Sequence, residues 1–316
     1  MIDVVVVSRN TEALDICSYE LASVDDSPLP AFSAGAHIDV HLPNGLIRQY
    51  SLCNHPQERH RYLIGVLKDA ASRGGSASLH EQVHAGSRLQ ISEPRNLFPL
   101  VHEARRSLLF AGGIGITPIL CMAERLAHSG ADFELHYCAR ASERAAFVQR
   151  LNASAFADRV FLHFDEQPQT ALDTARVLAA PEDNAHVYVC GPGGFMQHIL
   201  DTARAQGWQE NCLHREYFAA IPVDNSNDGR FSVKVASTGQ IIEVPADKTV
   251  VQALESQGIE ITLSCEQGIC GTCLTRVLEG VPEHRDLFLT EEEQALNDQF
   301  TPCCSRSKTP LLVLDI

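Results

Sequence analysis

The stretch Cys265-Glu-Gln-Gly-Ile-Cys270-Gly-Thr-Cys273 determines what the C-terminal part of this chain folds around. Its C-x4-C-x2-C spacing is the one with which three thiolates hold a [2Fe–2S] cluster, a fourth cysteine following further along the chain. The loop has to be tight because three sulfurs converge on one small inorganic core, and Gly268 and Gly271 give it backbone conformations that a Cβ disfavours. We therefore predict that these three cysteines bind iron.

The fourth ligand is expected from Cys303 or Cys304, which are adjacent. Successive side chains of an extended segment point to opposite faces, so only one of the two can face the cluster. Our prediction is Cys303, with Cys304 packed as a small buried apolar residue. Two other interpretations of the cysteines stay open. Structural zinc usually takes paired short spacings, and disulfides suit small secreted domains.

Length and composition limit the class of protein. A chain of 316 residues predicts roughly two or three domains. The formal net charge of −15 argues against nucleic acid as a partner. No apolar run is long enough to span a membrane, and Val4–Val7 is better explained as a buried strand than as part of a signal peptide. Eleven cysteines without a signal peptide predict a cytoplasmic protein.

Three segments with different patterns predict a multidomain fold. Residues 1–100 show many short apolar runs separated by turns, which predicts an antiparallel β-barrel or sandwich. In residues 101–223 strands alternate with helices, which predicts a parallel sheet in a nucleotide-binding α/β domain. The polar residues 224–230 have the composition of a linker. Residues 231–316 combine a hairpin, a short helix, the cluster loop and a closing strand in a compact α+β domain.

The expected elements can be stated by residue. The predicted strands are Val4–Val7, Ala36–Leu42, Tyr50–Cys53, Tyr62–Leu67, Arg88–Ile91, Ser107–Ala111, Phe133–Cys138, Val160–Phe164, Val187–Cys190, Phe231–Val235, Gln240–Val244, Cys273–Val277 and Leu311–Leu314. The predicted helices are Ala77–Gln82, Pro118–Ala127 and Val250–Gln257. Thr290 and Glu293 form a capping-box pattern, which predicts one more helix start before Ala295.

Two glycine-rich loops follow strands of the α/β segment. Gly112-Gly113-Ile114-Gly115-Ile116-Thr117-Pro118 comes between a strand and a helix, where free N–H groups bind phosphate, and Pro118 suits a first helical position. Cys190-Gly191-Pro192-Gly193-Gly194 has the same context. Ligands of an open parallel sheet lie at the C-terminal ends of its strands, so both loops should line one crevice. A plain strand-to-helix turn is the simpler interpretation of each loop alone.

The β segment contains a second pattern suited to a cofactor. In Arg48-Gln-Tyr50-Ser51 the arginine and the tyrosine share a strand face, where one suits a phosphate and the other an apolar ring system. Arg73-Gly74-Gly75-Ser76 precedes the predicted helix Ala77–Gln82, and is therefore another possible anion site.

Together these motifs resemble a known family. Arg48-Gln-Tyr-Ser51 is similar to the R-x-Y-S flavin motif of the ferredoxin–NADP reductase superfamily, and Gly113-x-Gly115-x-x-Pro118 and Cys190-Gly-Pro192 are similar to its pyridine-nucleotide motifs. With the ferredoxin-like segment last, the order resembles that of the phthalate dioxygenase reductase and vanillate demethylase reductase family. The resemblance covers essentially the whole chain. It implies an FMN-binding antiparallel Greek-key β-barrel, an NADH-binding α/β domain and a β-grasp [2Fe–2S] ferredoxin domain.

The resemblance also implies roles for particular residues. It assigns the flavin to Arg48, Tyr50 and Ser51, the flavin phosphate to Gly74, Gly75 and Ser76, the nicotinamide nucleotide to Gly113, Gly115, Thr117, Pro118, Cys190, Gly191 and Pro192, and the adenosine end to Arg140. Phe218 matches the aromatic ring that stacks on the flavin, and we count Phe218 and Cys190 as catalytic. The family spacing C-x4-C-x2-C-x29-C supports Cys303 as the fourth ligand.

The expected function is electron transfer from NADH through FMN and the [2Fe–2S] cluster to a terminal Rieske-type oxygenase that acts on an aromatic compound. A Rieske centre needs two histidines and two cysteines. Cys212-Leu-His214 has the C-x-H spacing, but no C-x-x-H follows it, so oxygen activation is expected on another protein. FAD in place of FMN, a different electron acceptor and a non-enzymatic iron–sulfur sensor remain alternatives. The choice of NADH over NADPH stays open, because Glu143 lies between Arg140 and Arg144.

Overall fold

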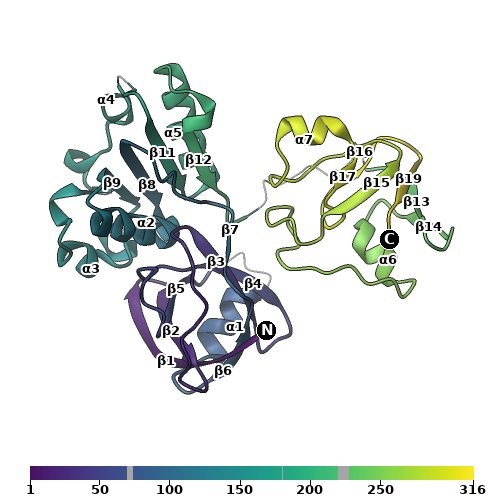
Figure 1. Cartoon of the computed structure of the whole chain (residues 1–316), viewed down its shortest axis with the longest axis horizontal. Helices are drawn as coiled ribbons and strands as arrows, with labels where there is room; N and C mark the ends of the chain where they lie inside the picture. Colours follow the sequence, from purple (N-terminus) through teal and green to yellow (C-terminus); the bar gives the residue numbers. More distant parts are fainter. Residues whose placement is uncertain (70–73, 180, 220–227) are drawn as a thin grey trace. The chain divides into compact units, whose positions relative to one another are not determined.

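The computed structural model describes residues 1–69, 74–179, 181–219 and 228–316. They form two compact units, Met1–Glu216 and Tyr217–Ile316 (Figure 1). The finer domain boundaries predicted at residues 100, 223 and 230 stay a proposal. Residues 224–227 of the predicted linker, and Arg73 of the predicted anion loop, lie outside the described residues.

The first half of the first unit is an antiparallel sheet with strand order β4-β3-β6-β1-β2-β5, and β7 pairs with β3. Because β6 lies between β3 and β1, the order is that of a Greek key and not of a meander. The end strands β4 and β5 meet through one bridge, Leu52–Ile64, so no continuous ladder closes the barrel in the part of the chain described. The strands are β1 (Ile2–Ala13), β2 (Ile16–Ser23), β3 (Ala36–His41), β4 (Ile47–Ser51), β5 (Tyr62–Leu67), β6 (Arg88–Ile91) and β7 (Arg95–Asn96), and helix α1 is Gly75–Gln82.

Most of the predicted strands of this half are present, and two differences have clear causes. β2 was missed because Ser18 and Glu20 interrupt its apolar residues, yet Cys17, Tyr19 and Leu21 alternate into the barrel core. β4 covers Ile47–Ser51 and not the predicted Tyr50–Cys53, because each of its residues pairs with one of β3. Pairing with a neighbouring strand therefore recruits polar residues that local hydrophobicity leaves out.

The second half of the first unit is a parallel sheet with order β10-β9-β8-β11-β12, as the alternating pattern predicted. Its strands are β8 (Arg106–Gly112), β9 (Asp132–Ala139), β10 (Val160–Phe164), β11 (Ala185–Cys190) and the unpredicted β12 (Leu213–Glu216). Its α-helices are α2 (Ile116–Ser129), α3 (Val148–Asn152), α4 (Thr174–Val177) and α5 (Gly193–Ala205). Short 3-10 turns cover Gly113–Gly115, Ser142–Arg144, Ala157–Arg159, Pro168–Thr170 and Glu210–Cys212. Pro118 is the third residue of α2 and not the first, because the 3-10 turn leads directly into the helix at Ile116.

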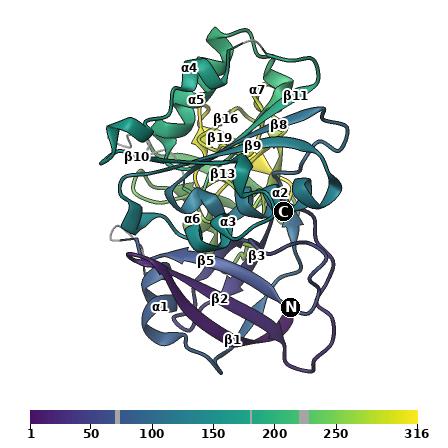
Figure 2. The ribbon, with the colours of Figure 1, turned by 90° about the vertical axis from the view of Figure 1, so that its left-hand side faces the viewer.

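The two halves of the first unit share a hydrophobic core. Figures 1 and 2 show α2 between the parallel sheet and the barrel strands. One buried cluster joins Ile119 and Met122 of α2 to Cys53, Leu63 and Phe98 of the barrel half. The burial of apolar surface away from water at this junction therefore holds the C-terminal ends of the parallel strands against the barrel.

The second unit is an α+β fold with sheet order β14-β13-β19-β15-β17. Strand β13 pairs antiparallel with β14 and parallel with β19, which is the β-grasp arrangement expected. Both helices begin with complete capping boxes, at Thr249 with Gln252 and at the predicted Thr290 with Glu293. The elements are β13 (Phe231–Val235), β14 (Ile241–Val244), α6 (Val250–Glu255), β15 (Thr275–Glu279), β16 (Pro282–Glu283), α7 (Glu291–Leu296), β17 (Gln299–Phe300), β18 (Arg306–Ser307) and β19 (Leu311–Leu314).

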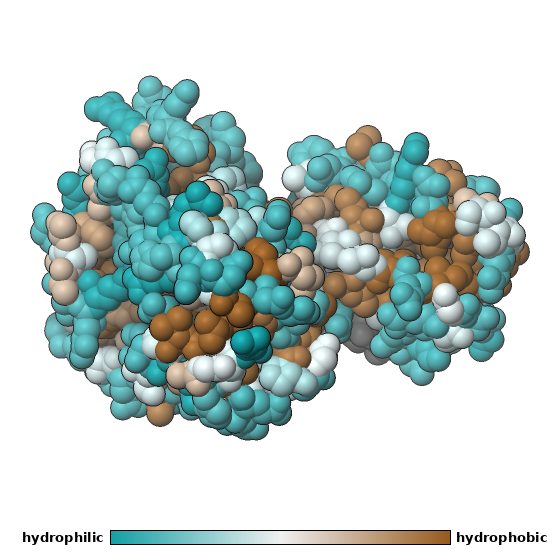
Figure 3. All heavy atoms as spheres, turned by 60° about the horizontal axis from the view of Figure 1, so that its bottom comes forward, coloured by the Kyte–Doolittle hydropathy of each residue, from teal (hydrophilic) through white to brown (hydrophobic). Residues whose placement is uncertain are grey.

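The molecular surface is mainly hydrophilic, with scattered apolar areas on both units in the view of Figure 3. In the second unit, large apolar side chains that reach the surface include Ile241, Leu278 and Leu296. None of the helices within the described ranges is both long enough and apolar enough to cross a lipid bilayer.

Gly35 offers a test of the contact between the barrel loop and its neighbours. It has φ +92°, and a Cβ at this position would overlap the backbone carbonyl of Phe98. We expect Gly35→Ala to lower the free energy of unfolding by about 2 kcal/mol more than Gly45→Ala. Gly45 is the matched control, since it has φ +82° but no atom within 4 Å of the added Cβ. Thermal unfolding followed by circular dichroism measures both, and equal losses would contradict the overlap.

Candidate functional site

Four buried cysteines of the second unit form one group. The loop between α6 and β15 carries Cys265, Cys270 and Cys273, and Cys303 follows β17. The Cys303 sulfur interacts with those of Cys265, Cys273 and the adjacent Cys304, and the Cys265 sulfur also interacts with that of Cys270. The fold therefore brings together the four sulfurs that the sequence spacing singled out.

The backbone of this loop depends on its two glycines. Gly268 has φ +70° and Gly271 has φ +69°. A Cβ on Gly268 would overlap the Cys304 sulfur, and one on Gly271 would overlap the ring of Phe288. Residues with side chains are thus excluded at both positions by conformation and by space.

Backbone N–H groups donate to two of these sulfurs, as suits sulfurs that bind metal as thiolates. The N–H of Gln267 donates to Cys265 Sγ at 3.3 Å, and that of Thr272 donates to Cys270 Sγ at 3.5 Å. The Cys270 and Cys303 thiols hold the pKa of Cys265 well below its usual range, and the same interactions raise the pKa values of Cys270 and Cys303. Backbone donors of this kind also raise the reduction potential of an iron–sulfur cluster.

Cys304 has a different environment from Cys303. Its sulfur lies 3.3 Å from Thr301 Oγ1 and packs against Gly268. Cys304 is half-buried, whereas Cys303 is buried among the other three cysteines. Among the described residues no three His, Cys, Asp or Glu side chains are arranged to hold a metal ion. A [2Fe–2S] cluster does not require this, because it distributes four thiolates over two irons.

The predicted flavin residues Arg48, Tyr50 and Ser51 all belong to β4. The side chain of Arg48 extends over the first turn of α1, because a Cβ on Gly75 would come within 2.8 Å of Arg48 Cγ and 2.9 Å of its Nε. Gly74 is the N-cap of α1, with φ 96°, and its carbonyl accepts a hydrogen bond from Asn44 Nδ2. Ser76 Oγ accepts the N–H of Asp69. An arginine above a helix N-terminus is suited to a phosphate.

Tyr50 lies on the same strand face as Arg48 and packs against the barrel core. Burial raises the pKa of its hydroxyl well above the usual value, so the phenol stays neutral. A neutral half-buried ring beside a cation fits the expected contact with a planar heterocycle.

Ser51 connects the barrel to the parallel sheet. Its hydroxyl donates to Glu216 Oε2 at 3.2 Å, and Glu216 is paired in register with Cys190 at the ends of β12 and β11. Cys190 is fully buried, and this burial raises the pKa of its thiol well above the usual value, so it is a thiol and not a thiolate. The fold thus brings Ser51, Cys190 and Glu216 to one place from three separate strands.

Glu216 is a candidate that the sequence reasoning missed. Removal of its carboxyl from water raises the pKa to about 8, which the bond from Ser51 only partly offsets. A carboxyl that titrates near neutrality inside a site is a common mark of function. The available signal was its position directly before Tyr217-Phe218, but the predicted strands did not include β12.

The two glycine loops are in contact. A Cβ on Gly115 would overlap the Cys190 carbonyl, and one on Gly112 would come within 2.9 Å of Pro192 Cδ. Gly113, Gly193 and Gly194, by contrast, have no atom within 4 Å of an added Cβ. Some of the glycines therefore allow the loops to approach each other, while others leave bare backbone facing open space. This arrangement suits a nucleotide lying along the ends of β8 and β11.

The other predicted residues are distributed unevenly. Thr117 is buried and its hydroxyl donates to the Ile114 carbonyl, so it supports the loop from behind. Pro118 is also buried, and Arg140 is exposed after β9. Phe218 lies in the second unit and is 39% exposed. The cofactor roles of these four residues stay predictions.

Comparison with known proteins identifies the family. Residues 233–308 match the family model of the 2Fe-2S iron-sulfur cluster binding domain. The chain is 76% identical over 317 residues to vanillate O-demethylase oxidoreductase of Pseudomonas putida, with all of both chains covered. The chain belongs to the phthalate dioxygenase reductase and vanillate O-demethylase reductase family.

Two further relatives support this assignment. The chain is 42% identical to the phthalate 4,5-dioxygenase oxygenase reductase subunit of Pseudomonas putida, with 98% of this chain and 95% of the relative covered. The solved structure of phthalate dioxygenase reductase, described as modular for electron transfer from pyridine nucleotides to [2Fe-2S], matches with a TM-score of 0.78 and 37% identity. It covers 99% of this chain and 97% of that one.

As a member of this reductase family the protein is an electron-transfer oxidoreductase with a [2Fe–2S] cluster, a flavin and a nicotinamide nucleotide. The predicted family, fold class, enzyme class and cofactor types are confirmed. The residues that contact each cofactor are not tested by these comparisons, and remain our assignment.

The choice between the adjacent cysteines can be tested directly. We expect Cys303→Ser to lose the cluster, because it removes the thiol at the centre of the sulfur group. Cys304→Ser is the matched control and should retain cluster absorbance and the reduced-state electron paramagnetic resonance signal. Iron and sulfide content after anaerobic purification gives a second measure. Loss of the cluster in Cys304→Ser with retention in Cys303→Ser would reverse the assignment.

Glu216 predicts a pH dependence of stability. Its folded pKa of about 8 is raised above the ordinary 4.5, so the folded state holds a proton that the unfolded state releases. The stabilisation is full below pH 4.5 and is lost as the pH rises to 8 and above. We expect Glu216→Gln to remove this decline, so that the variant gains stability relative to the wild type between these pH values.

Ser51→Ala supplies the control for this effect. The Ser51 hydroxyl lowers the folded-state pKa of Glu216, so its removal should extend the decline to higher pH. Chemical denaturation of the first unit from pH 4 to 9, followed by tryptophan fluorescence, measures all three proteins. A constant difference between Glu216→Gln and wild type over this range would show that the carboxyl does not titrate there.

Proposed function

We propose that this protein transfers electrons from NADH through FMN and its [2Fe–2S] cluster to a terminal Rieske-type oxygenase that demethylates an aromatic methyl ether, in the cytoplasm. The observation that carries this is the near-complete match to vanillate O-demethylase oxidoreductase, at 76% identity over the full length of both chains. The relative's name supports vanillate as the oxygenase's substrate.

FMN is supported by the shape of the phosphate site. Arg48 and the N-terminus of α1 face one another at the end of the barrel, which suits a single phosphate close to the ring-binding Tyr50. FAD is the alternative, and acid release followed by chromatography distinguishes the two.

NADH over NADPH is supported by acidic groups near the predicted adenosine end. Glu166 accepts the N–H and the hydroxyl of Ser142, two residues after Arg140. These bonds lower the pKa of Glu166, so its carboxylate is charged at neutral pH. Such a charge disfavours the 2′-phosphate of NADPH and can accept hydrogen bonds from ribose hydroxyls.

The protein's own residues position the reaction and exclude water. A bound flavin would supply the chemistry that accepts one hydride and releases its two electrons one at a time. The buried neutral thiol of Cys190 and the Ser51–Glu216 pair lie where the barrel meets the nucleotide loops. Ser51 can donate a hydrogen bond at this position, and Glu216 can hold or release a proton close to neutral pH.

Anaerobic sequential mixing tests the whole proposal. One equivalent of NADH should bleach both the flavin and the cluster bands, and subsequent mixing with an oxidised Rieske-type O-demethylase should reoxidise them while reducing the Rieske centre. Cys303→Ser is the matched control, since it should retain flavin bleaching but fail to reduce the oxygenase. Bleaching with NADPH but not NADH would contradict the nucleotide assignment. Reduction without transfer to the oxygenase would contradict the partner.

A further inference from the structure

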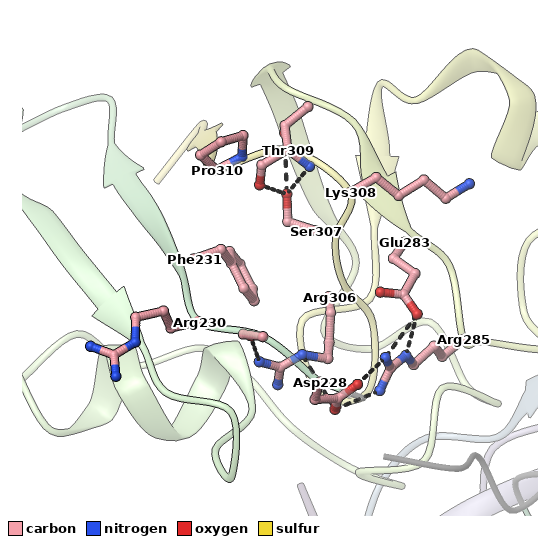
Figure 4. Close-up of a pocket in the computed structure, with 11 residues that line it drawn as sticks. Asp228, Arg230, Phe231, Glu283, Arg285, Arg306, Ser307, Lys308, Thr309 and Pro310 are labelled. Carbon is pink, nitrogen blue, oxygen red and sulfur yellow. Dashed lines mark hydrogen bonds and ion pairs between the residues drawn. The ribbon is translucent and has the colours of Figure 1, made fainter. Parts of the chain in front are cut away.

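Two arginines of the second unit converge on one carboxylate. Figure 4 shows Arg285 and Arg306 directed at Asp228, beside Glu283. Arg285 donates to both oxygens of Asp228, at 2.9 Å from Nη1 and 2.5 Å from Nη2, and Arg306 Nε lies 3.4 Å from Asp228 Oδ2. The three side chains are only 7–9% exposed. We call these residues, Asp228, Arg285 and Arg306, the clamp.

The clamp is completed by backbone carbonyls. Arg306 Nη1 donates to the Lys248 carbonyl at 2.8 Å, and its Nη2 donates to those of Gly229 and Pro245 at 2.9 and 3.1 Å. Its guanidinium also lies 5.2 Å from the centroid of the Phe231 ring. Arg285 gains a second carboxylate from Glu283 at 2.7 Å. Asp228 and Gly229, the first described residues of the predicted linker range 224–230, are therefore bonded to several parts of the ferredoxin fold.

A short series of bonds connects the clamp to the cluster loop. The N–H of Arg285 donates to Ser305 Oγ at 3.1 Å, two residues after Cys303. The next residue, Asp286, accepts the N–H of Leu289 at 2.8 Å and lies against Gly268. The N–H of Leu287 donates to the Gly268 carbonyl at 2.9 Å, inside the Cys265–Cys270 loop. Three consecutive residues thus join the clamp to the backbone around the cluster.

Stabilisation of the fold alone does not explain this buried ion group. A buried ion group is weak evidence for stability, because the cost of desolvating the charges can exceed their attraction. Within the clamp, however, Asp228 belongs to the residue range 224–230 that the sequence predicts to be a linker. The residues that follow Arg285 contact the cluster loop. The position of the clamp suits control of where the cluster is held relative to the end of that linker.

We propose that Asp228, held by Arg285 and Arg306, is a positioning residue that fixes the cluster-binding loop to the end of the interdomain linker for electron transfer from flavin to cluster. The proposal rests on the electron route given above. Loss of the Asp228 carboxylate would remove the side-chain anchor between this end of the predicted linker and Arg285. A looser attachment of one domain lowers its effective concentration at the other, here on the order of twofold. Loss of a fixed orientation would add to this effect.

The test compares Asp228→Ala, Asp228→Asn and a control in full-length protein loaded with both cofactors. The control is Glu243→Gln, which removes the exposed ion pair of Arg230 with Glu243 in the same region. Anaerobic stopped-flow with NADH separates flavin reduction from cluster reduction, and the cluster's midpoint potential and resonance spectrum are measured for each variant. The asparagine retains one acceptor oxygen for Arg285, and should restore part of the rate.

We expect the rate of flavin reduction, the midpoint potential of the cluster and its electron paramagnetic resonance spectrum to be unchanged in all variants. Cluster reduction should slow by more than about twofold in Asp228→Ala, by less in Asp228→Asn and not at all in Glu243→Gln. An unchanged rate in Asp228→Ala, an equal loss in the control, or a potential shift that accounts for the slower rate would overturn the proposal.

Two other outcomes are also decisive. If Asp228→Ala does not assemble its cluster while Asp228→Asn transfers electrons at the wild-type rate, the clamp is structural and the proposal fails. If the wild-type protein itself does not pass electrons from NADH to the cluster, the proposed function fails, which is separate from failure of the clamp.

Discussion

The packing of α2 between the barrel and the parallel sheet is the constraint on which the chemistry of the first unit depends. This helix begins directly after the glycine turn of β8 and buries Ile119 and Met122 against residues of the barrel half. Its apolar face fixes the C-terminal ends of β8 and β11 at the edge of the barrel. Cofactors of an open parallel sheet lie at those ends. The same contact therefore holds the two glycine loops, predicted to bind the nucleotide, beside the predicted flavin motif of β4.

The consequence is visible in the bond from Ser51 to Glu216, which spans 165 residues of sequence and joins the two halves of the first unit. Neither residue is remarkable within its own strand. Together with the buried thiol of Cys190 they form a partly desolvated polar group, in which a carboxyl titrates near neutral pH. Desolvation by the surrounding fold, and not the type of residue, creates this property.

In the second unit the corresponding requirement is to hold the four predicted cysteine ligands close together. The cluster loop has little regular structure of its own, and its shape comes from two left-handed glycines and from contacts with the segment Arg285–Leu289. That segment is anchored in turn by the ion group of Asp228, Arg285 and Arg306. The cluster loop and the described end of the predicted linker therefore contact the same short stretch of chain.

The cysteine spacing, the glycine loops, the alternation of strands and helices and the Thr290–Glu293 capping box were all readable from the sequence by itself. Each is a local pattern whose physics acts within a few residues, so the iron–sulfur domain, the parallel sheet and the helix start could be predicted. Tertiary structure decided the rest. Strands β2 and β12 exist because neighbours pair with them, Cys303 is distinguished from Cys304 by the thiols it contacts, and Glu216 and Asp228 gain their partners from distant segments. These features depend on burial and on contacts between residues far apart in the chain, which no local pattern encodes.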